Sequence, residues 1–474
     1  MDEGLLEKLE CYADRDVRAM HMPGHKRNAG AARYLDRLGA RLDITEIDGF
    51  DNLHDPSGIL KDAMDRAAAL WGSQHAFYLV NGSTCGILAG VRATTAPGNR
   101  VIVARNGHQS VYHALELMEL GASYILPEFD EALGVYGSVS PESVAGALAQ
   151  NPDARLVVVT SPTYEGAVSD IAAIRRVTSA QGVPLMVDEA HGAHLGFSSH
   201  FTGGAVAAGA DIVIQSLHKT LPSLTQTAIA HVGGLADPAR FQAALSIFQT
   251  SSPSYLLMAS IDGCVRLIER EGDRLFDAWA AGLDAFDRAA QGLSRLSLPG
   301  HGAPQSPAMR AFDRSKILIS TRQAALTGPA LMEALRTDHN IELEMASCDF
   351  ALAMTGLTEP GGALPALSAA LRVIDRSCQS ASVPPEPLEA PSLPVRAMTI
   401  AQASRKPREA LPLQESLGRI SWQYAWAYPP GVPLIVPGEW VDENFLREAA
   451  RYARSGVTLR GCPAEGLLWV VRDG

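Results

Sequence analysis

The chain carries, at residues 212–226, the stretch IVIQSLHKTLPSLTQ. Its first three residues are apolar and indicate a short buried strand, and the polar and loop-forming residues that follow surround a single lysine, Lys219. This lysine has two interpretations. It is an ordinary surface lysine, since lysine is almost never fully buried, or it is an amine held close to a core and desolvated enough to form a Schiff base with a carbonyl compound.

The 474 residues suffice for two or three domains, each with its own core. Hydrophobic residues make up 47% and charged residues 19%, which is ordinary for a globular enzyme and excludes a disordered chain. The formal net charge of −12 gives no reason to expect nucleic acid or an anionic membrane as a partner. The six cysteines form no CxxC pair, and neither a signal core nor a membrane-spanning apolar run is seen. We therefore expect a soluble, cytoplasmic protein with free thiols.

From about residue 60, short apolar runs alternate with helix-like segments. Continuous apolar strands separated by helices are typical of a mostly parallel sheet covered on both faces, so the fold class predicted is α/β. The predicted strands are 76–80, 101–103, 156–159, 185–187 and 212–214. We expect four parts, namely an N-terminal arm at 1–60, a large domain at 61–275, a small α+β domain at 276–380, and a proline-rich linker with a C-terminal domain at 381–474.

Ligands of such sheets bind beyond the carboxyl ends of the strands, so the residues after each run are the candidates for chemistry. Gly82, Ser83 and Thr84 follow the first strand and open a helical segment. Free backbone N–H groups, the helix dipole and two hydroxyls suit a phosphate there, although many strand–helix turns have this composition. His108 follows the second strand, where it either stacks on a flat cofactor or makes a hydrogen bond within a loop.

Asp188 leaves the fourth predicted strand, and an aspartate in that place is costly unless it has a partner. A protonated pyridine nitrogen is one such partner. The competing interpretation is a metal site made of Asp188, His191 and His194, but no further acidic or cysteine cluster completes it, and no metal is expected. A phosphate cradle, a stacking histidine, an aspartate and a lysine together are the parts of a pyridoxal 5′-phosphate (PLP) site, and their conjunction is more specific than any one of them.

The order of these residues resembles that of the fold-type-I PLP-dependent enzymes, and within them the ornithine/lysine/arginine decarboxylases, in the shorter bacterial form that lacks an N-terminal wing domain. The likeness covers nearly the whole chain. The motifs that carry it are PGHK at 23–26, DNLH at 51–54, GST at 82–84, RNGH at 105–108, PTYEG at 162–166, DEAHGAH at 188–194, SLHK at 216–219, LTQ at 224–226, YPPG at 428–431 and PGE at 437–439.

The resemblance implies a role for each site residue. Lys219 would bind PLP covalently, Asp188 would pair with the pyridine nitrogen, and His108 would stack on the ring with Ala190 against the opposite face. Either His218 or Lys219 would return a proton to the substrate's Cα. The remaining cofactor contacts would come from Gly82, Ser83, Thr84, Thr163, His191, Ser216 and His218.

The implied reaction is decarboxylation of a basic L-amino acid, arginine or lysine before ornithine, to the corresponding amine. An aminotransferase or lyase on the same fold is one alternative, and a non-catalytic polyamine-binding relative is another. The absence of a clear late arginine motif argues against the first, and the presence of Lys219 together with Asp188 argues against the second. The predicted substrate contacts are His25, Glu165 and Glu439, with Glu189 as a further candidate.

Relatives of this kind form homodimers or larger homo-oligomers with active sites at the subunit interface. The loop around His25 and the stretch at 250–255 would then serve the neighbouring subunit's site. One departure is Gly107, where the family commonly has cysteine or valine before the stacking histidine, and we expect it to loosen that loop.

Overall fold

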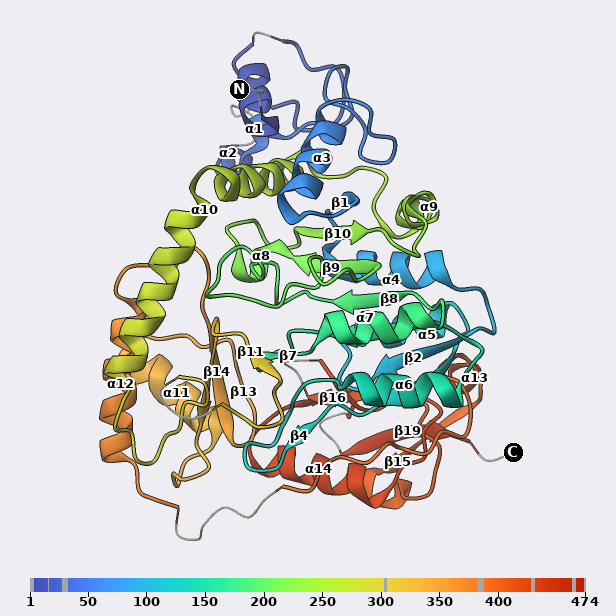
Figure 1. Ribbon diagram of the computed structural model, residues 1–474, viewed down its shortest axis with the longest axis vertical. Coiled ribbons are helices and arrows are strands. Elements are labelled where there is room, and N and C mark those ends of the chain that lie inside the picture. Colours follow the sequence, from blue (N-terminus) through green and yellow to red (C-terminus); the bar gives the residue numbers. More distant parts are fainter. Residues whose placement is uncertain are drawn as a thin grey trace.

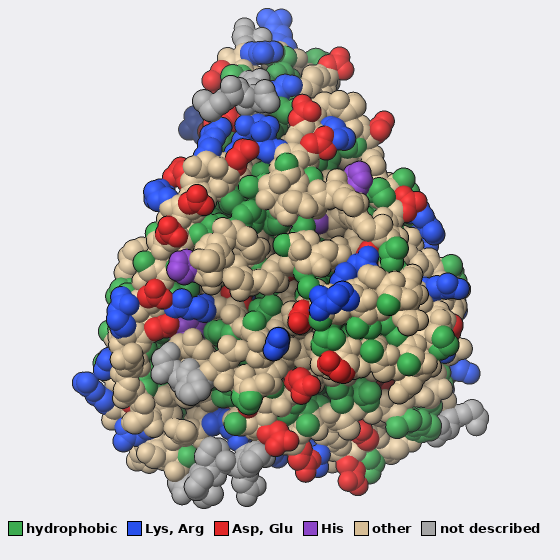
Figure 2. Space-filling model, in the orientation of Figure 1, with side chains coloured by type: hydrophobic (Ala, Val, Ile, Leu, Met, Phe, Trp, Pro, Cys, Tyr) green, Lys and Arg blue, Asp and Glu red, His purple; other side chains and the backbone are tan. Residues whose placement is uncertain are grey.

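The computed structural model describes residues 4–15, 17–27, 33–301, 305–381, 388–427, 431–462 and 466–472. Two predicted features, residues 382–387 of the proline-rich segment and the Tyr428-Pro429-Pro430 part of the C-terminal motif, lie outside these ranges. Among the described residues, none of the helices combines the length and the apolarity needed to cross a membrane. On the face seen in Figure 2, basic and acidic side chains are interspersed.

A seven-stranded sheet lies at the centre of the molecule, with the strand order β1-β10-β9-β8-β6-β2-β3 (Figure 1). Only β10 runs against its neighbours, and the other strands are parallel to one another. The α/β prediction is confirmed, and each predicted strand is present, whereas β3 and β10 were not predicted. The strands are β1 (His75–Leu79), β2 (Arg100–Ala104), β3 (Gly121–Ile125), β6 (Ala154–Thr160), β8 (Leu185–Asp188), β9 (Ile212–Ser216) and β10 (Ala228–Val232).

Helices cover both faces of this sheet, which explains why its strands are apolar on both sides. Val101 and Val103 of β2 belong to one core cluster, with α4, α5 and α9, whereas Ile102 and Ala104 of the same strand belong to another, with α6 and α7. The helices are α4 (Gly82–Thr94), α5 (Gln109–Leu117), α6 (Pro141–Gln150), α7 (Ile171–Ala180) and α9 (Pro238–Phe248).

The longest helix, α10 (Tyr255–Ala289), has 35 residues and joins the N-terminal region to the small domain. At its start it packs against α1 (Leu5–Ala13) and α3 (Ile59–Trp71), and further along it packs against α12 (Ala363–Ser377). The N-terminal region also contains α2 (Arg33–Asp36) and η1 (Ala40–Leu42). The predicted boundary after residue 275 falls inside α10, and the division into four parts stays a prediction.

The small α+β region is built on a three-stranded antiparallel sheet in the order β12-β14-β13. A two-stranded pairing of β7 with β11 ties this region to the loop that follows β6. The elements are β12 (Lys316–Ser320), β13 (Met345–Ala346), β14 (Phe350–Met354), α11 (Gly328–His339), β7 (Ala167–Val168), β11 (Ala311–Phe312) and the hairpin of β4 (Phe129–Asp130) with β5 (Val135–Tyr136).

The C-terminal region packs beneath the β2–β3 side of the central sheet. It forms a small separate core around Ile435, Phe445 and Val470. Its elements are α13 (Ile400–Ser404), β15 (Arg408–Pro412), η2 (Leu413–Ser416), β16 (Ala425–Ala427), β17 (Pro433–Ile435), α14 (Glu443–Arg454), β18 (Leu459–Arg460) and β19 (Leu467–Val471).

Candidate active site

The carboxyl ends of β8 and β9 meet at one edge of the sheet, because the two strands are parallel and adjacent. β8 ends at Asp188, and β9 leads into the short helix α8 (Leu217–Thr220), which carries Lys219. Asp188 stands opposite Ile214 in the register of the pair. The fold therefore brings the predicted aspartate and the predicted lysine to the same edge.

The Lys219 amine contacts an imidazole, with Nζ 2.9 Å from His191 Nε2. Burial lowers the pKa of Lys219, the Asp188 carboxylate opposes this shift, and the Lys316 charge adds to it. Burial, together with the charges of Lys219 and Lys316, also holds the pKa of His191 well below its usual range. The amine is therefore shifted toward the neutral, nucleophilic form that attacks a carbonyl.

Asp188 and His191 each keep unused hydrogen-bonding capacity at this edge. Asp188 is only 2% exposed, and Oδ1 accepts one backbone hydrogen bond, from Ala190 N–H at 3.2 Å. Burial raises the pKa of Asp188, and the Lys219 charge opposes that shift. Among the described residues, the charge that acts on Asp188 is that of Lys219, which is not within ion-pair distance, and His191 Nδ1 is buried without a hydrogen-bond partner. A buried carboxylate without a cationic partner fits the pyridine nitrogen of PLP.

The N-terminus of α4 lies beside the end of β9. Gly82 opens the helix with φ +73°, a left-handed conformation that favours glycine, and its N–H donates to Gln226 O at 3.0 Å. Ser216 Oγ donates to Ser83 Oγ at 3.1 Å. The exposed Thr84 follows. Two hydroxyls at a helix N-terminus fit a phosphate, as the sequence predicted for this turn.

His108 is the N-cap of α5, where Nδ1 accepts from Ser110 N–H at 3.3 Å. Burial lowers the pKa of His108 to about 4, and the charges of Lys219 and His113 act in the same direction. The ring is therefore neutral near pH 7, as stacking on a protonated pyridine requires. Gly107 N–H donates to Ala104 O at 2.9 Å, and the expected loosening of this loop stays a prediction.

The remaining predicted cofactor contacts lie around this edge. His218 Nδ1 donates to Thr227 O at 2.8 Å, which fixes its tautomer, and burial lowers the pKa of His218. Thr163 is buried, and its Oγ1 accepts from Ala167 N–H at 3.1 Å. Ala190, next to the Asp188 carboxyl, is also buried. The contacts of these residues with a cofactor stay predictions.

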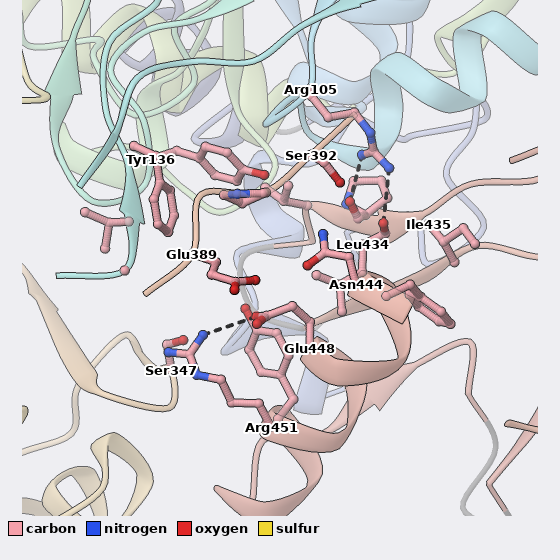
Figure 3. Close-up of a pocket in the computed structure, with 18 of the residues that line it drawn as sticks. Arg105, Tyr136, Ser347, Glu389, Ser392, Leu434, Ile435, Asn444, Glu448 and Arg451 are labelled. Atoms are coloured by element: carbon pink, nitrogen blue, oxygen red, sulfur yellow. Dashed lines mark hydrogen bonds and ion pairs between the residues drawn. The ribbon is translucent and has the colours of Figure 1, made fainter. Parts of the chain in front are cut away.

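The predicted substrate contacts lie in different places. Glu165 is half-buried and lines a pocket between the loop after β6, β13 and α14, and burial raises its pKa. Figure 3 shows this pocket, with Tyr136, Ser347 and Glu448 among its labelled residues. Its neighbour Tyr164 packs on His191, with ring centroids 4.4 Å apart. His25 contacts Asp43 at 3.2 Å and the backbone of Arg27 in the N-terminal region. Its predicted role toward a neighbouring subunit stays a prediction.

Glu439 is fully buried within this chain. Its Oε2 accepts from Arg105 Nη2 at 3.1 Å and from Val436 N–H at 2.8 Å. Arg105 also donates to the backbone oxygens of Pro433 and Leu434 in β17. Figure 3 shows Arg105 beside Leu434. The carboxylate is thus engaged in an interior ion pair between β2 and the C-terminal region, and its predicted contact with substrate stays untested.

Glu189 and His194 have contacts inside the chain that the sequence did not indicate. Glu189, a candidate for the substrate's cation, is fully buried and bonded to Gln215 Nε2 at 2.7 Å and Ala205 N–H at 2.8 Å. His194, the third member of the alternative metal site, instead contacts Asp313 at 3.0 Å and Thr220 at 3.1 Å. Within the described ranges no group of three or more potential ligands could hold a metal ion.

Sequence reasoning missed Asp313, Lys316 and Glu344. Asp313 and Lys316 bond to the turn that carries His191 and His194, and Glu344 accepts from the Tyr164 hydroxyl. One signal was available, because Lys316 begins the apolar run 316–320, where a lysine is unusual.

Comparison with known proteins adds whole-chain matches. The family model described as the major domain of Orn/Lys/Arg decarboxylase matches residues 4–294, and the model of the C-terminal domain of that family matches residues 387–455. The arginine decarboxylase of Bacillus subtilis (strain 168) is 33% identical over 472 residues, covering 98% of this chain and 96% of that protein. The arginine decarboxylase of Bacillus anthracis is 30% identical, covering 96% of this chain and 94% of that protein.

Solved structures show the same fold. The Francisella novicida lysine decarboxylase LdcF superposes with a TM-score of 0.82 at 18% identity, covering 99% of this chain and 81% of that one. The Escherichia coli constitutive lysine decarboxylase gives a TM-score of 0.78 at 18% identity, and the match covers 99% of this chain and 82% of that one. A Sphingomonas wittichii serine palmitoyltransferase, at a TM-score of 0.54 and 16% identity, covers 74% of this chain and 83% of its own. With both family models and near full-length relatives matching, the chain belongs to the ornithine/lysine/arginine decarboxylase family.

Proposed function

We propose that this protein is a PLP-dependent carboxy-lyase that converts a basic L-amino acid, with arginine favoured, to the corresponding amine and CO2. The observation that carries the proposal is the Lys219 amine 2.9 Å from His191, at the same sheet edge as the unpaired, buried Asp188. Arginine is favoured over lysine because the relatives that are at least 30% identical over nearly the whole chain include arginine decarboxylases. Ornithine is the least favoured.

PLP, when bound, supplies an electron-withdrawing ring that accepts the electrons left by the departing carboxylate. The chain's own residues prepare the site for it. Lys219 offers an amine whose pKa burial has lowered, and Asp188 offers a carboxylate to a ring nitrogen. The neutral His108 offers a flat face, and Ser83 and Ser216 offer hydroxyls to a phosphate.

The proton that replaces CO2 at Cα needs a donor near Lys219. Lys219 Nζ and His218 are the two candidates. His218 Nδ1 is committed to Thr227 O, so its Nε2 is the atom that could hold and return a proton. Orientation of the substrate carboxylate is the protein's other contribution to rate.

The carboxylates near this edge support a cationic substrate. Glu165 follows Tyr164, whose ring packs on His191, and Glu344 is bonded to the Tyr164 hydroxyl. A guanidinium or ammonium group is the natural partner of such carboxylates.

We also propose that the protein acts in the cytoplasm as a homodimer or larger homo-oligomer. In this assembly the loop around His25 would serve a neighbouring subunit's site. Sedimentation of the full chain tests the assembly.

The test of the reaction begins with the absorbance spectrum of the purified protein, supplemented with PLP, before and after borohydride. A yellow band that borohydride abolishes, with the label mapped to Lys219, is the expected result. Release of CO2 from arginine, lysine and ornithine then identifies the substrate, whereas a keto acid formed without CO2 would reveal a transaminase. No band, or an unchanged band in Lys219→Ala, would overturn the proposal.

A further inference from the structure

A buried ion pair of the small domain contacts the turn that carries His191, the residue whose ring contacts the Lys219 amine. Lys316 Nζ donates to Asp313 Oδ2 at 3.0 Å, and both side chains are at most 2% exposed. Lys316 also donates to Ser315 Oγ at 2.7 Å and to His191 O at 3.1 Å, so its three N–H donors all have acceptors. Leaving a charge unpaired at such depth is costly, which makes the pair's geometry strongly defined.

The pair reaches the neighbours of Lys219 by two routes. On one side, Lys316 holds the carbonyl of His191, whose ring contacts Lys219 Nζ. On the other side, Asp313 Oδ1 accepts from His194 Nε2 at 3.0 Å, and His194 Nδ1 lies 3.1 Å from the Oγ1 of Thr220. Because the carboxylate can only accept, Nε2 carries the proton and Nδ1 accepts from the Thr220 hydroxyl.

Thr220 is the residue after Lys219, and the small domain holds it a second time. Leu357 N–H donates to Thr220 O at 2.9 Å, so both the hydroxyl and the carbonyl of Thr220 are engaged. Thr220 and His194 are almost completely buried, which removes water as a competing partner. Lys219 is thereby held on two sides: its amine contacts His191, and its backbone continues into Thr220, and both of these residues are bonded to the cluster around the same ion pair.

We propose that Asp313, Lys316 and His194 are positioning residues that hold the Lys219 amine in its reactive place through Thr220 and His191. This inference rests on the proposed function, since it assigns the cluster a part in the work of Lys219. The cluster touches neither the expected cofactor nor the reacting atoms, and it acts only by fixing the residues that do. It also makes the reactivity of Lys219 depend on how the small domain is docked.

Thr220→Val tests the inference with the least disturbance, because it keeps the shape and removes only the hydroxyl. The readout is the pH titration of the cofactor's absorbance in the full-length protein, which reports the environment of the Lys219 nitrogen. Thr220→Val alters none of the charged or titratable groups around that nitrogen, which are Asp188, His191, His108, His218, Lys316 and Glu344. We expect a shifted midpoint and a kcat lowered roughly three- to tenfold at unchanged KM, the loss for one neutral hydrogen bond.

Two further variants control this experiment. Thr220→Ser keeps a hydroxyl and should restore the wild-type midpoint. Thr178→Val removes an equally buried hydroxyl in α7, bonded to Arg175 O at 3.2 Å, and should leave the midpoint and kcat unchanged. A Thr220→Val protein that matches Thr178→Val in both measurements would overturn the inference while leaving the proposed function intact.

Lys316→Met gives an independent readout through charge. Removing a positive charge near Lys219 should move the midpoint to higher pH, the direction opposite to that expected of Asp313→Asn. If a single variant fails to fold, Asp313→Asn/Lys316→Met removes both charges, and Thr220→Val still decides the matter. A wild-type protein without any cofactor band would overturn the proposed function and this inference together.

Discussion

Asp188 and Glu189 are adjacent carboxyl groups with different surroundings. Burial raises the pKa of Glu189 to about 8, from an ordinary value of 4.5, against the hydrogen bonds from Gln215 and Ala205. The folded chain therefore keeps a proton that the unfolded chain releases between about pH 4.5 and pH 8. Because the folded state binds more protons there, the free energy of unfolding contributed by this residue falls as the pH rises through that range.

Glu189→Gln removes this titration. We expect the variant's free energy of unfolding, relative to that of wild type, to be higher at pH 8 than at pH 5, which means that the variant is relatively more stable at pH 8. Urea unfolding at both pH values measures this. Gln181→Glu, an exposed change in the turn after α7, serves as a control without a buried carboxyl. A relative stability that is the same at both pH values would contradict the assignment of a raised pKa to Glu189.

The loop residue Asp51 caps a helix from a distance. Its Oδ2 accepts from the N–H groups of Gly58 at 2.8 Å and Leu60 at 3.0 Å, at the start of α3. Despite partial burial, backbone hydrogen bonds hold its pKa below the ordinary range. Asp51→Ala should cost about 1–2 kcal/mol at neutral pH, and Asp51→Asn less, since one acceptor remains. The contribution of the ionised Asp51 carboxylate to the free energy of unfolding should decline as the pH falls below the ordinary carboxyl pKa and be lost once the pH passes below the lowered pKa of the folded state, and a thermal-unfolding series against pH checks this.

At the scale of elements, α4 depends on close approach to the sheet. A Cβ on Gly86 would lie 2.6 Å from Leu79 Cδ1, in the buried interface, whereas one on Gly146 in α6 would meet nothing within 4 Å. Gly86→Ala should destabilise the protein by about 1–3 kcal/mol, and Gly146→Ala should stabilise it by about 0.4–1 kcal/mol. Gly86→Ala should also weaken PLP binding, because it displaces the helix that carries Ser83. Equal effects of the two substitutions on unfolding would contradict this packing.

Predictability from sequence followed the strength of local patterns. The strands with uninterrupted Val, Ile and Leu were found because burial on both faces leaves no polar position. β3 (GASYI) and β10 (AIAHV) were missed because glycine, serine and a buried histidine break that pattern. Lys219, Asp188 and His108 could be proposed as site residues because each follows a clear strand, and their roles stay predictions. Asp313 and Lys316 could not be placed, since their partners are more than a hundred residues away in sequence and only tertiary structure joins them.

At the scale of the whole molecule, two of the ion pairs among the described residues join the C-terminal region to the large domain. Arg105–Glu439 is buried, with side chains 4% and 0% exposed, and Arg405–Glu119 is exposed, at 64% and 47%. Glu439→Gln should destabilise the chain by roughly 3–5 kcal/mol because Arg105 remains buried without a counter-charge. Glu119→Gln, the matched control, should change little. Urea unfolding and proteolysis of the C-terminal region measure both, and equal effects would show that burial of the pair is immaterial.

The helix α10 has a mechanical consequence. Its 35 residues form one uninterrupted hydrogen-bonded coil that bends as it leaves the N-terminal region and continues to the small domain. A joint made of loop swings freely, whereas a bent helix resists deformation and returns to one resting shape. Displacement of the small domain would therefore strain α10. Elastic relaxation of the helix would then favour the arrangement in which the Asp313–Lys316 pair contacts the turn that carries His191.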